Sequence, residues 1–152
     1  MIKRTTIVFF SLLIFLTGCS LSPTPQATPT AEEQPIIIPE LNGSFWIVAS
    51  INGNDPIRGT SITLTFVDGW VTGNSGCNTY GGEYAANDQG ELDVLFLIRQ
   101  EVSCLEPPGI MEQEDMYLDI LEGIEQYGLV EGYLRLDASD DYLLLGQLAI
   151  TE

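Results

Sequence analysis

The stretch from Gly73 to Tyr84 constrains the fold more than any other part of the chain. It reads Gly-Asn-Ser-Gly-Cys-Asn-Thr-Tyr-Gly-Gly-Glu-Tyr and lies between two runs rich in aromatic and β-branched residues. Glycine is favoured where φ is positive or where two backbones approach closely, and asparagine is the usual second choice. We therefore predict a tight backbone crossing with a structural role. Five residues carry this motif: Gly73, Gly76, Asn78, Gly81 and Gly82.

The runs on both sides of this motif have the pattern of antiparallel strands. Residues 44–51 are aromatic and β-branched and end at an Asn-Gly-Asn turn, and residues 61–67 alternate between apolar residues and threonine. Such alternation is typical of a half-buried strand, and Asp68-Gly69 is a hairpin signal. Further strands are predicted at residues 70–73, 80–85, 92–96, 132–136 and 142–149.

A single helix is predicted between residues 110 and 127. Apolar side chains recur there at helical spacing, and Gly128 supplies a stop. The apolar positions are Tyr117, Ile120, Leu121, Ile124 and Tyr127. Acidic residues fill the other positions, and we interpret them as a solvated face: Glu112, Glu114, Asp115, Asp119, Glu122 and Glu125.

Residues 1–18 have the pattern of a bacterial lipoprotein signal peptide. Two basic residues precede an apolar run at residues 7–16, which at about 10 residues is too short to span a bilayer. The sequence Leu-Thr-Gly-Cys at residues 16–19 resembles the bacterial lipobox. We expect cleavage before Cys19 and lipidation of Cys19 by diacylglycerol and further acyl chains such as palmitate, which together make a durable anchor. An ordinary leader that contains a cysteine is the alternative.

Residues 19–40 are predicted to be a lipidated tether, followed by one globular domain at residues 41–152. Five prolines interleaved with Ser, Thr, Gln and Ala favour extended conformations over a packed element. The apolar run at residues 36–38 is the exception. It is either an edge strand that docks on the domain or an apolar patch that awaits a partner, and we favour the strand.

The charge balance excludes two classes of partner. The chain has 5 basic and 22 acidic residues, and two of the basic ones, Lys3 and Arg4, lie in the leader. Nucleic acid is not expected to bind, because phosphate recognition needs clustered Lys and Arg. The same balance opposes electrostatic docking of the domain on anionic lipid.

Three motifs occur in the order expected of one known domain family. Residues 41–46 read Leu-Asn-Gly-Ser-Phe-Trp, the central motif covers residues 72–84, and Val102-Ser103-Cys104 is followed by Pro107. With the helix and the last hairpin, this order resembles the META domain family, to which small heat-inducible bacterial envelope lipoproteins belong. The resemblance covers roughly residues 41–150. It implies an α+β fold in which a strongly curved, cracked-barrel-like antiparallel sheet packs round one main helix.

The resemblance brings no family-wide catalytic activity and no cofactor, so it implies only a structural role for Cys77 and Cys104. Chemistry favours a disulfide between them, because with Cys19 acylated an even number of cysteines remains in an oxidising compartment. Closing a loop of this length stabilises a domain by about 3.6 kcal/mol on the chain-entropy estimate. Two free buried thiols are the alternative. The chain has no histidine, which removes Cys/His dyads, Ser/His/Asp triads and most zinc sites.

Acidic residues near the expected hairpin at residues 87–90 could form a Ca²⁺ site or an acid/base pair. Their spacing matches no calcium-binding loop, so we interpret them as exposed turn charges and expect no metal site. The residues concerned are Glu83, Asp88, Glu91 and Asp93.

The sequence thus predicts a monomeric, non-catalytic domain, held by an N-terminal lipid on the extracytoplasmic side of a bacterial membrane. In the favoured hypothesis it binds another envelope protein or macromolecule, or protects the envelope during stress. An acidic surface would speed association with basic partners. The alternative is a carrier of a small apolar ligand, such as a lipid tail, inside the cracked barrel. An enzyme is the third choice.

Overall fold

The computed structural model describes residues 37–147. The expected leader, Cys19 and most of the expected tether lie outside these residues. The described part contains eight strands and one helix. In chain order they are β1 (Ser44–Ile51), β2 (Ile62–Val67), β3 (Trp70–Ser75), β4 (Thr79–Ala86), β5 (Leu92–Arg99), α1 (Ile110–Glu122), β6 (Gln126–Val130), β7 (Tyr133–Ala138) and β8 (Asp141–Gln147).

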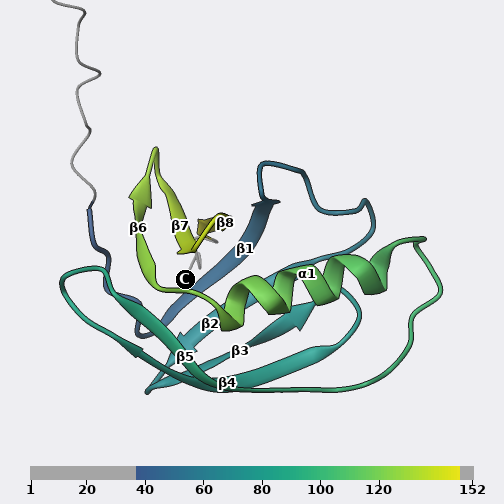
Figure 1. Cartoon of the computed structure of the whole chain (residues 1–152), viewed down its shortest axis with the longest axis horizontal. Coiled ribbons are helices and arrows are strands. Elements are labelled where there is room, and N and C mark those ends of the chain that lie inside the picture. The colour runs from purple at the N-terminus through teal and green to yellow at the C-terminus, as the bar shows by residue number, and fades with distance from the viewer. Residues whose placement is uncertain (1–36, 148–152) are drawn as a thin grey trace, which may run out of the picture. The chain divides into compact units, whose positions relative to one another are not determined.

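All eight strands belong to one antiparallel sheet in the order β5-β4-β3-β2-β1-β8-β7-β6. The sheet curls strongly, and α1 lies across it and contacts β3, β5 and β8 (Figure 1). The predicted fold class, an α+β domain with a curved antiparallel sheet round one helix, is confirmed.

The two edge strands, β5 and β6, approach each other at one end only. Glu91 and Gln126 form an isolated antiparallel bridge, where the Tyr127 N–H donates to the Gly90 carbonyl at 2.7 Å. The Leu92 N–H donates to the Glu125 carbonyl at 3.1 Å. Because these contacts do not continue along the strands, the sheet is a barrel that is closed at one point and open beyond it.

Local sequence accounts for the first hairpins. The prediction for β1 matches the structure at both ends, and the inward side chains of β2 are Ile62, Leu64 and Phe66. Asp68 and Gly69 have φ values of 50° and 81°, as a two-residue type I′ turn requires. The twist of this turn matches that of the strands, so it fixes their register.

The predicted end of the helix is wrong. The helix begins at Ile110 but ends at Glu122, and the Gly123 N–H closes its last turn on the carbonyls of Asp119 and Ile120. Ile124 and Tyr127 continue the helical spacing in the sequence, yet they enter the core from beyond the helix. Gly123, and not Gly128, is the stop.

The strand β6 was missed for the same reason. It pairs with β7, and Gly128 lies opposite Arg135 inside this ladder. The turn that joins the two strands is Glu131-Gly132, with φ values of 52° and 85°. The last two strands were predicted, although β7 extends to Ala138 and not only to Leu136.

One apolar cluster fills the space between the sheet and the helix. It includes Trp46 and Phe66 from the sheet and Leu121 from α1, each no more than 2% exposed. Trp70 on β3, by contrast, is 51% exposed. It precedes Val71, which is fully buried, and neighbours along a strand point to opposite faces.

The chain before β1 also contacts the sheet. The Leu129 N–H donates to the Ile37 carbonyl at 2.7 Å in an isolated antiparallel bridge, and Ile38 packs against the core. The apolar run therefore docks on the domain at residues 37 and 38, but as an isolated bridge and not as the edge strand that we favoured. Among residues 37–147 there is no helix with the length and apolar character needed to cross a membrane.

Candidate functional site

The predicted backbone crossing is a tight turn between β3 and β4, at residues 75–78. The Ser75 N–H donates to the Asn78 carbonyl at 2.8 Å, and Gly76 has a φ of 114°, which disfavours any side chain there. Ser75 and Asn78 are almost completely buried. Two polar side chains at a buried turn need partners, because an unsatisfied buried polar group costs about 1–3 kcal/mol.

The partner of both residues is Glu114 on α1, which is 1% exposed. One carboxylate oxygen, Oε2, accepts from the Ser75 hydroxyl at 2.5 Å and from the Asn78 N–H at 2.8 Å. The other oxygen, Oε1, accepts from the Asn78 side-chain amide at 2.6 Å. One helical side chain therefore anchors α1 to the turn.

Burial alone would raise the pKa of Glu114. Hydrogen bonds from the side chains of Ser75 and Asn78, and from the backbone N–H groups of Asn78 and Cys77, outweigh burial and hold the pKa of Glu114 below its ordinary value. Glu114 is therefore a carboxylate at neutral pH, and its charge is distributed over these donors.

This position corrects our interpretation of the acidic helix face. Glu114 was grouped with the solvated carboxylates, but it lies on the buried side of the helix with Ile110, Tyr117, Leu118 and Leu121. The spacing contained the signal, because residue 114 follows Ile110 by four positions and precedes Tyr117 by three. A lone acid within an apolar stripe indicates a buried, hydrogen-bonded carboxylate.

Asn78 connects the turn to the long segment between β5 and α1. Its side-chain oxygen accepts from the Val102 N–H at 2.9 Å, and its amide nitrogen donates to the Val102 carbonyl at 2.8 Å. The disulfide between Cys77 and Cys104 lies beside this pair of bonds. The segment is thus tied to the turn at two neighbouring points, one covalent and one by hydrogen bonds.

A buried tyrosine pair lies next to the turn. The hydroxyls of Tyr80 and Tyr117 are 2.6 Å apart, and the Tyr80 hydroxyl also lies 2.9 Å from the Thr63 carbonyl, to which it donates. Burial raises the pKa of both phenols well above the ordinary value. Both therefore stay neutral and act as a polar link between the helix and the sheet.

The glycines of the motif differ in what they do. A Cβ on Gly73 would lie 1.9 Å from the Thr63 carbonyl oxygen, and one on Gly82 would lie 1.8 Å from that of Phe96. These two positions allow no side chain while the neighbouring strands stay in place. Gly81 is different, since its Cβ would make only ordinary contacts, the nearest at 3.6 Å from a Thr72 methyl.

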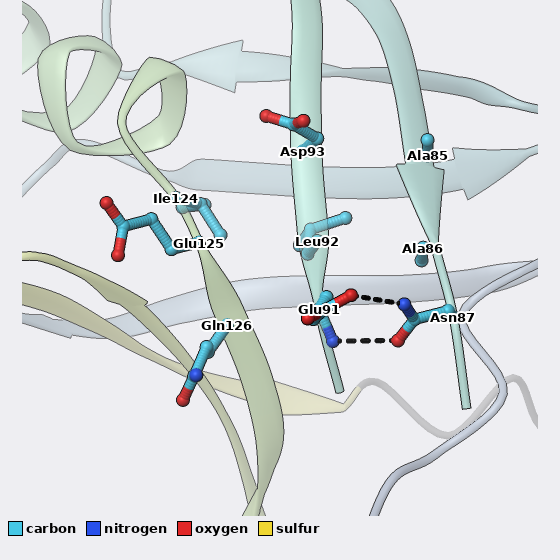
Figure 2. Close-up of a pocket in the computed structure, with 9 residues that line it drawn as sticks. All are labelled: Ala85, Ala86, Asn87, Glu91, Leu92, Asp93, Ile124, Glu125 and Gln126. Atoms are coloured by element: carbon cyan, nitrogen blue, oxygen red, sulfur yellow. Dashed lines mark hydrogen bonds between the residues drawn. The ribbon is translucent and has the colours of Figure 1, made fainter. Parts of the chain in front are cut away.

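An open groove of about 530 Å³ lies where β5 approaches β6 (Figure 2). Glu91 lies at this groove and accepts a hydrogen bond from the Asn87 side chain at 2.6 Å. The four carboxylates considered as a calcium or acid/base cluster are all exposed. No group of three or more metal-binding side chains occurs in the described part of the chain.

With this geometry in hand, comparison with known proteins gives the family. The META domain family model matches residues 39–149. The chain belongs to the META domain family. Its Gly-Cys-Asn turn, the disulfide and Glu114 on the helix lie within the matched residues. No curated protein matches the chain.

Solved structures agree with the fold. An NMR structure of a protein from Burkholderia xenovorans has 22% identity and a TM-score of 0.59, and the match covers 80% of this chain and 99% of that one. A second NMR structure has 23% identity and a TM-score of 0.57, over 70% of this chain and 90% of that one. A crystal structure of a DUF4847 family protein from Bacteroides vulgatus has 15% identity and a TM-score of 0.51, and the match covers 70% of this chain and 93% of that one. At these identities the likeness concerns the fold alone.

Proposed function

We propose that the protein is a lipid-anchored lipoprotein on the extracytoplasmic side of a bacterial membrane, and that its META domain binds another macromolecule of the cell envelope without catalysis. The observation that carries the anchor is the Leu-Thr-Gly-Cys sequence at residues 16–19, placed directly after an apolar run and before a proline-rich segment. A tether of that composition gives the domain reach without adding a packed element.

The anchor is tested by replacing the modified residue. Expressed in a bacterium with an alkyne analogue of palmitate, the full chain should carry the label and fractionate with membranes. Cys19→Ala should lose the label, whereas the neighbouring Ser20→Ala should keep it, as the unchanged chain does. A Cys19→Ala chain that still carries the label in the membrane fraction would contradict the anchor.

Binding without catalysis is supported by composition and by the placement of acids and apolar groups. The chain has no histidine, and its 22 acidic residues give it a formal net charge of −17. Several large apolar side chains are nevertheless exposed on the domain, among them Trp70, Phe96 and Ile98. Exposed apolar groups within an acidic surface suit contact with a basic macromolecule.

Crosslinking in cells tests this binding. The anchored chain should form an adduct of one defined mass, and the yield should fall when spheroplasts are treated at high salt before crosslinking, because surface charge attraction is screened. A chain that forms no adduct at any ionic strength would contradict the proposal.

We do not extend the proposal to the ligand carrier. The space between sheet and helix is occupied by the apolar cluster, to which Trp46, Phe66, Ile120, Leu121 and Ile124 all belong. Protein interiors packed in this way leave little room for an added lipid tail.

A further inference from the structure

Three exposed residues form one row across the outer face of the sheet. Trp70 on β3 lies opposite Glu83 on β4, and Glu83 lies opposite Phe96 on β5. Directly opposite residues of antiparallel strands point to the same face. We call these residues, Trp70, Glu83 and Phe96, the Trp70 row.

The Trp70 row faces solvent. Trp70 is 51% exposed and Phe96 is 66% exposed, and Glu83 is exposed between them. Neighbouring strands are about 4.8 Å apart, so the two aromatic side chains leave the sheet about 10 Å apart with the carboxylate between them. Aromatic faces attract cations within about 6 Å of the ring centre, and a carboxylate adds charge attraction.

The other half of the sheet already shows what such a pair binds. On the outer face of β7 and β8, Asp137 lies directly opposite Tyr142. Arg135 occupies this pair: its guanidinium carbon lies 4.1 Å above the centre of the Tyr142 ring, and its nitrogen lies 2.7 Å from the Asp137 carboxylate. A carboxylate opposite an aromatic residue thus holds a guanidinium on this sheet.

In the Trp70 row, the part of the chain that the structure describes supplies no such cation. Arg135 stands two residues before Asp137, and the residue two before Glu83 is Gly81, which has no side chain. The fold does not demand glycine at this position, because a Cβ there would meet only ordinary contacts and φ is not positive. The two ion pairs within residues 37–147 are Arg99–Asp115 and Arg135–Asp137, and neither includes Glu83.

We propose that the Trp70 row binds an arginine or lysine side chain of a protein partner, in the place that Arg135 fills on the other half of the sheet. The inference rests on the proposed function and names the chemistry of the partner. Ile98, 66% exposed, lies opposite Gly81 and extends the contact surface, so the basic residue of the partner is flanked by apolar ones.

Charge selects this occupant over two others. A second copy of the chain brings a net charge of −17 and offers few cations, of which Arg99 and Arg135 are already paired. A bilayer would have to accept Glu83 at the centre of the contact, and burying a carboxylate without a partner is costly.

The probe is the peptide acetyl-Val-Arg-Val-amide, compared with the same peptide containing neutral citrulline in place of arginine. Binding is followed by NMR on the chain from residue 20 onward, which keeps every described residue, at about 0.15 M salt to screen general attraction. The chain has two tryptophans, exposed Trp70 and buried Trp46. The Trp70 indole resonance should move with the arginine peptide, and the Trp46 resonance should not.

Variants assign the site. Glu83→Gln and Phe96→Ala should each lower the affinity for the arginine peptide by about threefold to fivefold, as expected for one exposed ion pair or cation–π contact. Glu131→Gln removes the same charge from the exposed β6–β7 turn and is the matched control, with affinity unchanged. Gly81→Arg places a cation of the chain itself beside the Trp70 row, and it should lower the affinity for the arginine peptide at least as much. Gly81→Ala should leave this affinity unchanged.

Three outcomes would overturn the inference: equal binding of the citrulline peptide, no effect of Glu83→Gln, or shifts confined to residues away from the Trp70 row. Gly81→Arg also separates this inference from the proposed function when the crosslinking experiment is repeated in cells. Loss of the adduct supports the Trp70 row, and an adduct retained at full yield overturns it while the binding function stands. If the chain bound lipid vesicles or formed a dimer, and either depended on Trp70, the occupant of the Trp70 row would be a bilayer or a second copy of the chain and not a protein partner.

Discussion

Replacing Glu114 by glutamine is expected to be among the most destabilising isosteric changes in the domain. Glutamine keeps the shape of the side chain but replaces one acceptor oxygen by an NH₂ donor. The partners of the carboxylate are all donors: the Ser75 hydroxyl, the Asn78 N–H, the Asn78 side-chain amide and the Cys77 N–H. The Asn78 amide cannot turn round, because both of its ends are held by the Val102 backbone.

Whichever orientation the new amide takes, at least one donor therefore faces another donor. Losing a hydrogen bond to a charged group costs about 1.5–3 kcal/mol, and bonds to a neutral acceptor are about half as strong as charge-assisted ones. One lost bond and the weakening of the others give a loss of about 4 kcal/mol in the free energy of unfolding. A domain of this size is stable by only about 5–15 kcal/mol.

Urea unfolding of the chain from residue 20 onward measures this loss, with fluorescence of buried Trp46 contributing to the signal. With a denaturant slope of about 1.5 kcal/mol per molar, the midpoint of Glu114→Gln should fall by about 2–3 M at pH 7. Glu112→Gln, an exposed change on the same helix, is the control and should cost no more than about 1 kcal/mol.

The pH dependence gives the test a second arm. The pKa of Glu114 is lowered in the folded state, so its charge contributes stability above the unfolded pKa and this contribution is lost as the pH falls through the folded pKa. The stability difference between the unchanged chain and Glu114→Gln should therefore be largest at neutral pH and shrink in acid. A difference that does not vary with pH, or that equals the Glu112→Gln value, would refute the reasoning.

Two further predictions concern the same region. Gly73→Ala should reduce the soluble yield and the unfolding midpoint severely, since its Cβ would lie 1.9 Å from the Thr63 carbonyl oxygen, whereas Gly81→Ala should change stability by less than about 1 kcal/mol; equal effects would contradict the close approach. Replacing Cys77 and Cys104 by serine should lower stability by about 3.6 kcal/mol and make the midpoint insensitive to reductant. A reductant that leaves the unchanged chain's midpoint in place would contradict a stabilising disulfide.

The features that sequence predicts well here are local. The alternation of Ile62, Leu64 and Phe66 follows from the two-residue period of a strand, and Asp68-Gly69 determines its own turn. The close approach at Gly73 was also a local expectation, because the residue type itself removes the side chain.

The end of the helix is not local in this sense. Ile124 fits the apolar stripe of the helix as well as the core that lies beyond it, and both Gly123 and Gly128 are acceptable stops. Only the pairing of β6 with β7 decides between them, and pairing with a distant strand leaves no mark on the helical pattern. Glu114 was misplaced because acidity was given more weight than its position in the stripe.

Glu114 is the most constrained carboxylate of the site, and its constraints argue for a structural role. A general acid or base works best when its pKa lies near the working pH and when it can reach a substrate proton. Glu114 has a lowered pKa, is 1% exposed, and uses both oxygens to hold donors of its own chain. This interaction locks the helix to the concave face of the sheet. A rigid sheet then presents Trp70 and Phe96 outward at a fixed spacing, which is why the outer face is the place to look for a partner.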